Sequence, residues 1–278
     1  MSTKIIVDST VDLPAALREQ TRIVPLTVLF GQEAYQDGVT INYQQFYEKL
    51  LVCQDLPTSS QPSPDAFAQA YQAVVDAGDE AVVLTISSKL SGTYQSACIA
   101  AEDFKGIYVV DTMTAAIGSG VLAQYALELC GQGLDAKAIA QRLEEEKGNV
   151  RLFAVLDTLE FLKRGGRLSA TAALAGSLLN IKPIITLTDG VIEVVGKARG
   201  LRRGNAMMTE EVAKAGGVNF SRPWQLGFTG LSDELLRNYM ADSTGLWPAD
   251  SNVAIIGSTI GTHVGPGAYA VAFFAKDK

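Results

Sequence analysis

Residues 81–93 read AVVLTISSKLSGT, an apolar run that passes directly into a turn rich in serine, threonine and glycine. The first six of these residues have the length and composition of a buried β-strand. Two similar apolar runs, residues 5–7 and 107–110, are separated from it by segments with helical spacing of apolar side chains. Strands that alternate with helices in this way indicate a mostly parallel sheet with helices on both faces.

The segments between these strands predict helices with recognisable ends. Ser63 followed by Pro64 is typical of a helix start, and apolar residues follow at the spacing of one helix face. The same spacing recurs over residues 121–129, before a stop at Gly131. A further helix is expected from an Asp135 cap to about residue 147.

The second half has a different pattern. Asp189-Gly190, between two apolar runs, indicates a β-hairpin because both residues tolerate a positive φ. The other expected elements are strands over residues 151–156 and 269–274, a short helix over 158–162, an alanine-rich helix over 170–179, and helices near 203–215 and 233–240. We therefore expect an α/β protein of two domains, residues 1–150 and 151–278, with the boundary placed to within about ten residues.

Composition excludes several classes of protein. The chain has 278 residues, a net charge of −7 and a pI near 4.9, which argues against general nucleic-acid binding. Its only histidine is His263, too few for a histidine-rich zinc site. The three cysteines form no CxxC pair, and this favours reduced thiols. With no signal peptide and no apolar stretch near the roughly 18 residues of a membrane span, we expect a cytoplasmic protein.

Polar residues follow all three strands of the predicted parallel sheet. Asp8-Ser9-Thr10, Ser87 to Thr93 and Asp111-Thr112 come directly after them. Ligands of open α/β sheets bind beyond the carboxyl ends of the strands, so these side chains mark a candidate site. The Ser91-Gly92-Thr93 turn also offers backbone N–H groups that suit a carboxylate or a phosphate. The alternative is that these residues are only helix caps and turns.

Three further segments are candidates for binding. Residues 57–64, PTSSQPSP, form a polar loop whose prolines hold its hydroxyls in place. His263 lies in GSTIGTHVGPG, residues 257–267, which we expect to be a glycine-dense loop. Two basic clusters, residues 163–167 and 197–203, are either solvated faces or a docking surface for an acidic or phosphorylated partner.

Common enzyme motifs are absent from the sequence. There is no GxSxG elbow, no phosphate-binding GxxxxGK[ST] motif and no GxGxxG after the first strand. An alternative function remains open, a small-molecule hydrolase or phosphotransferase with Asp8 or Asp111 as its nucleophile. The carboxylate that usually follows two residues after such an aspartate is replaced by Thr10.

Along nearly its whole length the chain resembles the DegV family of bacterial fatty-acid-binding proteins. The resemblance is specific because several motifs occur together and in order. They are IIVDSTVDLP at 5–14, SSQPSP at 59–64, SSKLSGTYQSA at 87–97, VDT at 110–112, LDTLEFLKRGGRLS at 156–169, KPI at 182–184 and GTHVGPGA at 261–268.

This resemblance implies a DegV-like fold with a Rossmann-like N-terminal sheet, a C-terminal α/β domain and a ligand tunnel between them. One long-chain fatty acid, such as palmitate, stearate or oleate, would be buried there, with no cofactor or metal. Its carboxylate would be held by Ser59, Ser91 and His263, with Gly92 as a backbone contact and Arg167 near the mouth. The family usually has threonine at position 59. Suggested wall positions, equally explained as core, are Leu159, Phe161, Leu162, Leu174, Leu178 and Ile181.

By the same resemblance, the protein is a lipid-binding carrier without catalytic residues. It would present the fatty acid to a separate fatty-acid kinase, which forms an acyl phosphate for phospholipid synthesis. Positive charge is concentrated in Lys197, Arg199, Arg202 and Arg203, which we expect to form the surface for that partner or for an anionic membrane.

Overall fold

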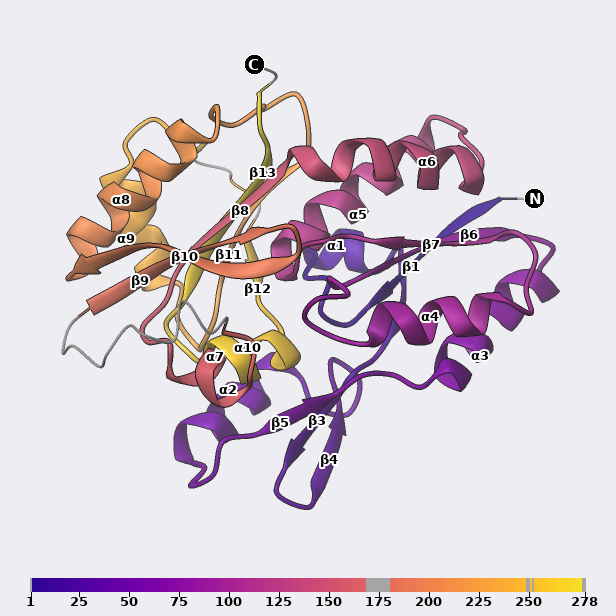
Figure 1. Ribbon diagram of the computed structural model, residues 1–278, viewed down its shortest axis with the longest axis horizontal. Coiled ribbons are helices and arrows are strands. Elements are labelled where there is room, and N and C mark those ends of the chain that lie inside the picture. Colours follow the sequence, from indigo (N-terminus) through magenta and orange to yellow (C-terminus); the bar gives the residue numbers. More distant parts are fainter. Residues whose placement is uncertain (1, 169–180, 249–250, 252, 277–278) are drawn as a thin grey trace.

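The protein is represented by a computed structural model that describes residues 2–168, 181–248, 251 and 253–276 (Figure 1). The helix expected over residues 170–179 lies outside the described residues, as do the suggested wall positions Leu174 and Leu178.

A four-stranded parallel sheet occupies the N-terminal part of the chain, in the order β2-β1-β6-β7. Its strands are β1 (Thr3–Asp8), β2 (Arg22–Val24), β6 (Glu80–Thr85) and β7 (Ile107–Asp111). The three strands and the parallel sheet expected from the sequence are confirmed, while β2 is an addition.

Helices cover both faces of this sheet. They are α3 (Pro64–Asp76) and α4 (Thr93–Ala101) on one face, and α5 (Ala116–Gly131) and α6 (Ala136–Glu146) on the other. Neighbouring side chains of a strand point to opposite faces. Ile6 therefore packs against α3 and α4, and Val7 packs against α5. The predicted caps are confirmed, since Ser63 Oγ accepts from the Ala66 N–H and the Asp135 carboxylate from the Ala138 N–H.

A six-stranded mixed sheet follows, in the order β10-β9-β8-β13-β11-β12. Its strands are β8 (Val150–Val155), β9 (Ile181–Thr188), β10 (Val191–Arg199), β11 (Trp224–Phe228), β12 (Val253–Ile255) and β13 (Tyr269–Phe274). Helices α8 (Leu201–Lys214) and α9 (Glu234–Asp242) pack on its outer face. Residue 150 begins β8, and the division of the chain into two domains at that point stays a prediction.

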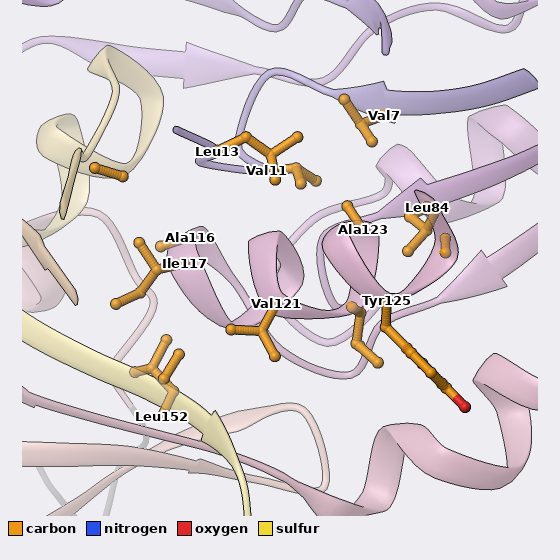
Figure 2. Packing of buried hydrophobic residues seen from close by; sticks show 14 of the residues in the cluster. Val7, Val11, Leu13, Leu84, Ala116, Ile117, Val121, Ala123, Tyr125 and Leu152 are labelled. Carbon is orange, nitrogen blue, oxygen red and sulfur yellow. The ribbon is translucent and has the colours of Figure 1, made fainter. Parts of the chain in front are cut away.

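Helix α5 lies between the two sheets. Leu152 of β8 lies on one side of it and Val7 of β1 on the other (Figure 2). The sequence predicted an amphipathic helix over residues 121–129. The observed helix begins earlier, at Ala116, and is buried almost all round because both sheets cover it.

The predicted β-hairpin is confirmed. Strands β9 and β10 pair antiparallel, and Asp189 and Gly190 between them have φ values of 49° and 79°. Such positive values belong to the turn type that fits the twist of a two-residue hairpin. The hairpin tip is anchored to the other sheet by Ser87, whose hydroxyl donates to the Gly190 carbonyl at 2.8 Å.

A small three-stranded sheet, which the sequence did not predict, extends from the N-terminal part (Figure 1). It contains β3 (Thr27–Phe30), β4 (Glu33–Gln36) and β5 (Thr58–Ser60), and α2 (Tyr43–Val52) packs against it. The expectation of a loop over residues 57–64 was therefore wrong for residues 58–60. They form a strand because their backbone pairs with β3, with Ser59 opposite Val28.

The glycine-dense segment at residues 257–267 was expected to be a loop, and most of it forms helix α10 (Ser258–Val264) instead. A distant carboxylate caps this helix: Asp37 accepts hydrogen bonds from the backbone N–H groups of Ser258 and Thr259. Local propensity, which is poor for glycine and threonine, is outweighed by this tertiary contact. Helix α7 (Glu160–Arg164) lies beside α10 (Figure 1).

Candidate functional site

A cavity of about 350 Å³ lies where the carboxyl ends of the parallel strands meet the inner face of the larger sheet. Most of its wall is apolar, formed by Leu26, Ile86, Leu90, Ala115, Ala116, Leu152, Ala154, Leu156, Leu162, Ile185, Leu187, Ile192, Ile256, Ile260, Val264, Ala268 and Ala270. Its polar lining is Thr10, Ser59, Ser60, Gln61, Ser91, Thr259, Arg167 and His263. Such a volume with few polar groups is typical of a small-molecule site.

Four of the five residues predicted to bind a ligand line this one cavity. Ser59 comes from β5, Ser91 from the turn before α4, Arg167 from the segment after α7, and His263 from the last turn of α10. The topology thus brings four separate segments of the chain to the wall of one cavity.

Gly92, the fifth, is not among the lining residues. It lies close to the side chain of Gln61, whose Oε1 would overlap with a Cβ on Gly92. Of the suggested wall positions, Leu162 lines the cavity, whereas Phe161 packs instead beside the cluster under α2 and the small sheet.

His263 is held between two close contacts. Its Nε2 lies 2.7 Å from Ser59 Oγ. On the other side of the ring, a Cβ on Gly165 would overlap with Nδ1, which is buried and has no hydrogen-bond partner among the described residues. Only glycine at position 165 leaves room for the ring in this position.

Burial, together with a smaller effect of the positive charge of Arg167, lowers the pKa of His263 to about 4. The imidazole is therefore neutral near pH 7. A buried N–H donor without a partner costs more than an acceptor without one, so the proton belongs on Nε2 rather than Nδ1. Nε2–H then donates to Ser59 Oγ, and the Ser59 hydroxyl is free to donate its own hydrogen into the cavity.

Arg167 is fixed by backbone carbonyls. Its Nε donates to the Leu90 carbonyl at 3.2 Å and its Nη1 to the Gly165 carbonyl at 2.6 Å. These bonds connect the turn that carries Ser91 to the residue that packs on His263. The guanidinium is the one cation among the described lining residues.

Gln61 is a lining residue that the sequence analysis did not single out. Its Nε2 donates to Ser96 Oγ of α4 at 3.0 Å, which ties the end of β5 to the helix that follows Ser91. Gln61 could have been predicted from the sequence by its position, two residues after Ser59 and inside the same proline-bounded segment.

Buried carboxylates hold α10, and with it His263, in place. Besides the Asp37 cap, Asp12 accepts from the Gly257 N–H at 2.8 Å. Burial raises the pKa of Asp12 well above its usual range, and the negative charge of Asp37 adds to that effect. Tyr47, fully buried on α2, donates to the Ile256 carbonyl at 2.9 Å.

The two aspartates considered as nucleophiles do not line the cavity. Asp8 is fully buried, and its carboxylate accepts from the N–H groups of Thr10 and Ile86. Burial raises its pKa to about 6, against the opposing effect of these hydrogen bonds. Asp111 accepts from the N–H groups of Ser88 and Met113. Both aspartates therefore hold the turns that follow their strands. This is the structural role, as caps and turns, that the sequence analysis gave as the alternative to a binding role.

The basic cluster lies outside the cavity. Lys197 and Arg199 on β10, and Arg202 and Arg203 on α8, are all exposed, and Arg203 forms an ion pair with Glu210 at 3.2 Å. Within the described ranges, no three histidine, cysteine, aspartate or glutamate side chains gather as a metal site. Nor does any helix of the described chain have the length and apolar character needed to cross a membrane.

The chain is similar to known proteins over almost its whole length. The DegV family model matches residues 2–276. A DegV domain-containing protein of Deinococcus radiodurans is 37% identical over 279 residues, covering 98% of each chain. The structure of a fatty-acid-binding DegV family protein from Thermus thermophilus has a TM-score of 0.88 at 33% identity, covering 99% of this chain and 100% of that one. A stearic acid-binding protein from Eubacterium ventriosum has a TM-score of 0.84 at 27% identity, covering 98% and 97%.

Proposed function

The chain belongs to the DegV family, and we propose that it binds one long-chain fatty acid in the cavity, as a carrier rather than an enzyme. One observation supports this most strongly. A mostly apolar cavity has a cluster of polar side chains in its wall: Ser59 contacts His263, Arg167 lies near His263, and Arg167 bonds to the carbonyl of Leu90, next to Ser91. That distribution matches an amphipathic ligand with a single polar head and a long apolar tail. The related structures from Thermus thermophilus and Eubacterium ventriosum are those of fatty-acid-binding proteins.

The polar cluster suits a carboxylate. A carboxylate that leaves water must regain its hydrogen bonds, or the cost of desolvation prevents binding. The hydroxyls of Ser59 and Ser91 donate two of them. Because His263 is neutral, the compensating positive charge comes from Arg167, and His263 acts by orienting Ser59. Hydrogen bonds to a charged group are worth about twice those between neutral groups.

The tail supplies most of the affinity. Each methylene buried against the apolar wall contributes about 0.8 kcal/mol. A dozen or more methylenes therefore outweigh the head group, which fixes the orientation of the acid. The ligand class that we propose is palmitate, stearate or oleate, with no cofactor.

We further propose that the bound acid is presented to a separate fatty-acid kinase for acyl-phosphate formation and phospholipid synthesis. Neither Asp8 nor Asp111 reaches the cavity, so the phosphoryl chemistry is assigned to that partner. The exposed cluster of Lys197, Arg199, Arg202 and Arg203 is our candidate for the surface that meets the kinase or an anionic membrane. We place the carrier in the cytoplasm, where its three free cysteines stay reduced.

Two experiments test these proposals. In the first, delipidated protein is titrated with oleate by calorimetry, using the wild type, Ser91→Ala and Asp8→Asn. A carrier loses affinity in Ser91→Ala, while Asp8→Asn, whose side chain is outside the cavity, retains it. In the second, the four basic residues are changed to glutamate and kinase-dependent phosphorylation of bound acid is measured. Unchanged phosphorylation contradicts the assigned partner surface.

A further inference from the structure

Leu187 lies between the cavity and a second hollow. That hollow is a groove of about 790 Å³ beside the C-terminal end of α8, on the other side of the β8–β9 region. Of the lining residues in the described part of the chain, Leu187 alone borders both spaces. Its side chain is half-buried and packs against the main core.

Strand register places Leu187 at the end of the β8–β9 wall opposite Leu156. Ile185 pairs with Ala154, so Leu187 lies level with Leu152. The opposite end of this wall is Leu156, which directly follows β8 and lies four residues beyond Leu152, or about 13 Å at 3.3 Å per residue. Helix α7 comes soon after Leu156 in the chain. Gly165, the residue that caps the C-terminal end of α7, packs against the His263 ring.

The groove beyond Leu187 offers apolar surface next to the barrier. Val150 and Phe153 of β8 and Val195 of β10 line it, together with Met113 near the hairpin tip. Side chains alternate along a strand, so Phe153 faces the groove while Leu152 and Ala154 face the cavity. An acyl chain that passed Leu187 would meet these four apolar side chains first. The rest of the groove wall includes the charged residues Glu144, Glu145, Lys147, Arg151, Asp189, Glu211 and Lys214.

We propose that Leu187 is the chain-length barrier of the cavity, which stops the methyl end of a bound acid and sets the longest acid that is accepted. This inference rests on the proposed function. When the barrier is removed, the tail of a longer straight-chain acid extends into the groove. Leu187 is thus a specificity-determining residue, with no part in holding the carboxylate.

The test is a binding series with myristic, palmitic, stearic, arachidic and behenic acids on delipidated protein. For the wild type, affinity rises with chain length to a limit and then falls. Leu187→Ala moves that limit upward by at least two carbons, and the two additional methylenes tighten binding about tenfold. Leu187→Phe keeps the core filled and moves the limit downward. The two variants therefore predict opposite shifts, which loss of stability alone does not produce.

Val195→Ala serves as the matched control. Val195 lines the groove but not the cavity, so alone it leaves the wild-type limit unchanged. In a Leu187→Ala background, it weakens binding of behenic acid specifically. An identical length limit in all variants, with palmitic acid still bound, overturns the barrier but leaves the proposed function intact. Failure of the wild type to bind any of the acids overturns both.

Discussion

Ser59 and His263 are 204 positions apart in the sequence, and Ser59 Oγ lies 2.7 Å from His263 Nε2. One is on an edge strand of the small sheet and the other is at the end of α10. Their meeting depends on contacts that fix both elements, the pairing of β5 with β3 and the capping of α10 by Asp37. The polar cluster of the cavity is therefore a product of tertiary structure.

Removal of the Ser59 hydroxyl should weaken fatty-acid binding without unfolding the protein. A hydrogen bond to a charged group contributes about 1.5–3 kcal/mol, so Ser59→Ala is expected to bind oleate roughly ten- to hundred-fold more weakly. Calorimetric titration measures this directly. Thr58→Ala changes an exposed residue of the same strand, outside the cavity lining, and should bind as the wild type does. Equal affinities of the two variants would show that Ser59 does not contact the head group.

Gly165 should be indispensable for the position of His263. Its φ of −72° is accessible to alanine, so the effect of Gly165→Ala comes from the contact of its Cβ with Nδ1. We expect displacement of the ring and at least tenfold weaker binding, about 1.4 kcal/mol. Gly131→Ala is the control, because a Cβ there meets nothing within 4 Å. Binding by Gly165→Ala at the wild-type level would refute this packing.

The low pKa of His263 predicts a pH dependence of stability. Its pKa is about 4 in the folded protein, against an ordinary value of 6.5 for histidine. Between these values the unfolded chain binds more protons, so the free energy of unfolding falls as the pH falls from 6.5 to 4. The loss attributable to this group is about 3 kcal/mol.

Comparison with His263→Gln isolates this effect. The pKa of Asp8 is raised to about 6, so its effect is opposite: it lowers the free energy of unfolding of the protein as the pH rises from about 4 to 6. Asp8 is present in both proteins, and the chain has no other histidine. Urea unfolding at a series of pH values should therefore show wild-type stability declining relative to the variant below pH 6.5. A constant difference between the two would mean that His263 titrates normally.

Asp37→Asn should destabilise α10. The variant keeps one acceptor oxygen but places an NH₂ group where Asp37 now accepts from a backbone N–H. We expect a loss of about 1–2 kcal/mol in unfolding free energy. Asp135→Asn, at the N-cap of α6, is the control for the change from aspartate to asparagine itself. It should lower the unfolding free energy by less than about 0.5 kcal/mol, because asparagine caps a helix equally well. Equal losses of unfolding free energy in Asp37→Asn and Asp135→Asn would show that Asp37 contributes no more than an ordinary helix cap.

The sequence predicted those elements whose signals are local. The parallel strands are continuous apolar runs, Ser63 and Asp135 are caps, and Asp189-Gly190 is a turn that needs positive φ. The small sheet was missed because its strands are only three or four residues long and are stabilised by pairing with distant partners. Helix α10 was missed because Asp37, which caps it, is more than 200 positions away.

The site was predictable in part for the same reason. Ser91 follows a recognisable strand, and family motifs marked Ser59, Arg167 and His263. The neutral state of His263 could not be predicted from the sequence, because its pKa depends on burial and on the nearby Arg167. The contact of Gly165 with the imidazole and the position of Leu187 between two hollows are also visible only in three dimensions.

The most direct test of the central claim is organic extraction of the purified protein followed by mass spectrometry of the extract. We predict one long-chain fatty acid per protein chain, retained because its tail is buried in the apolar cavity. A protein that carries no lipid, and that binds no added fatty acid, would contradict the assignment of this cavity as a fatty-acid site.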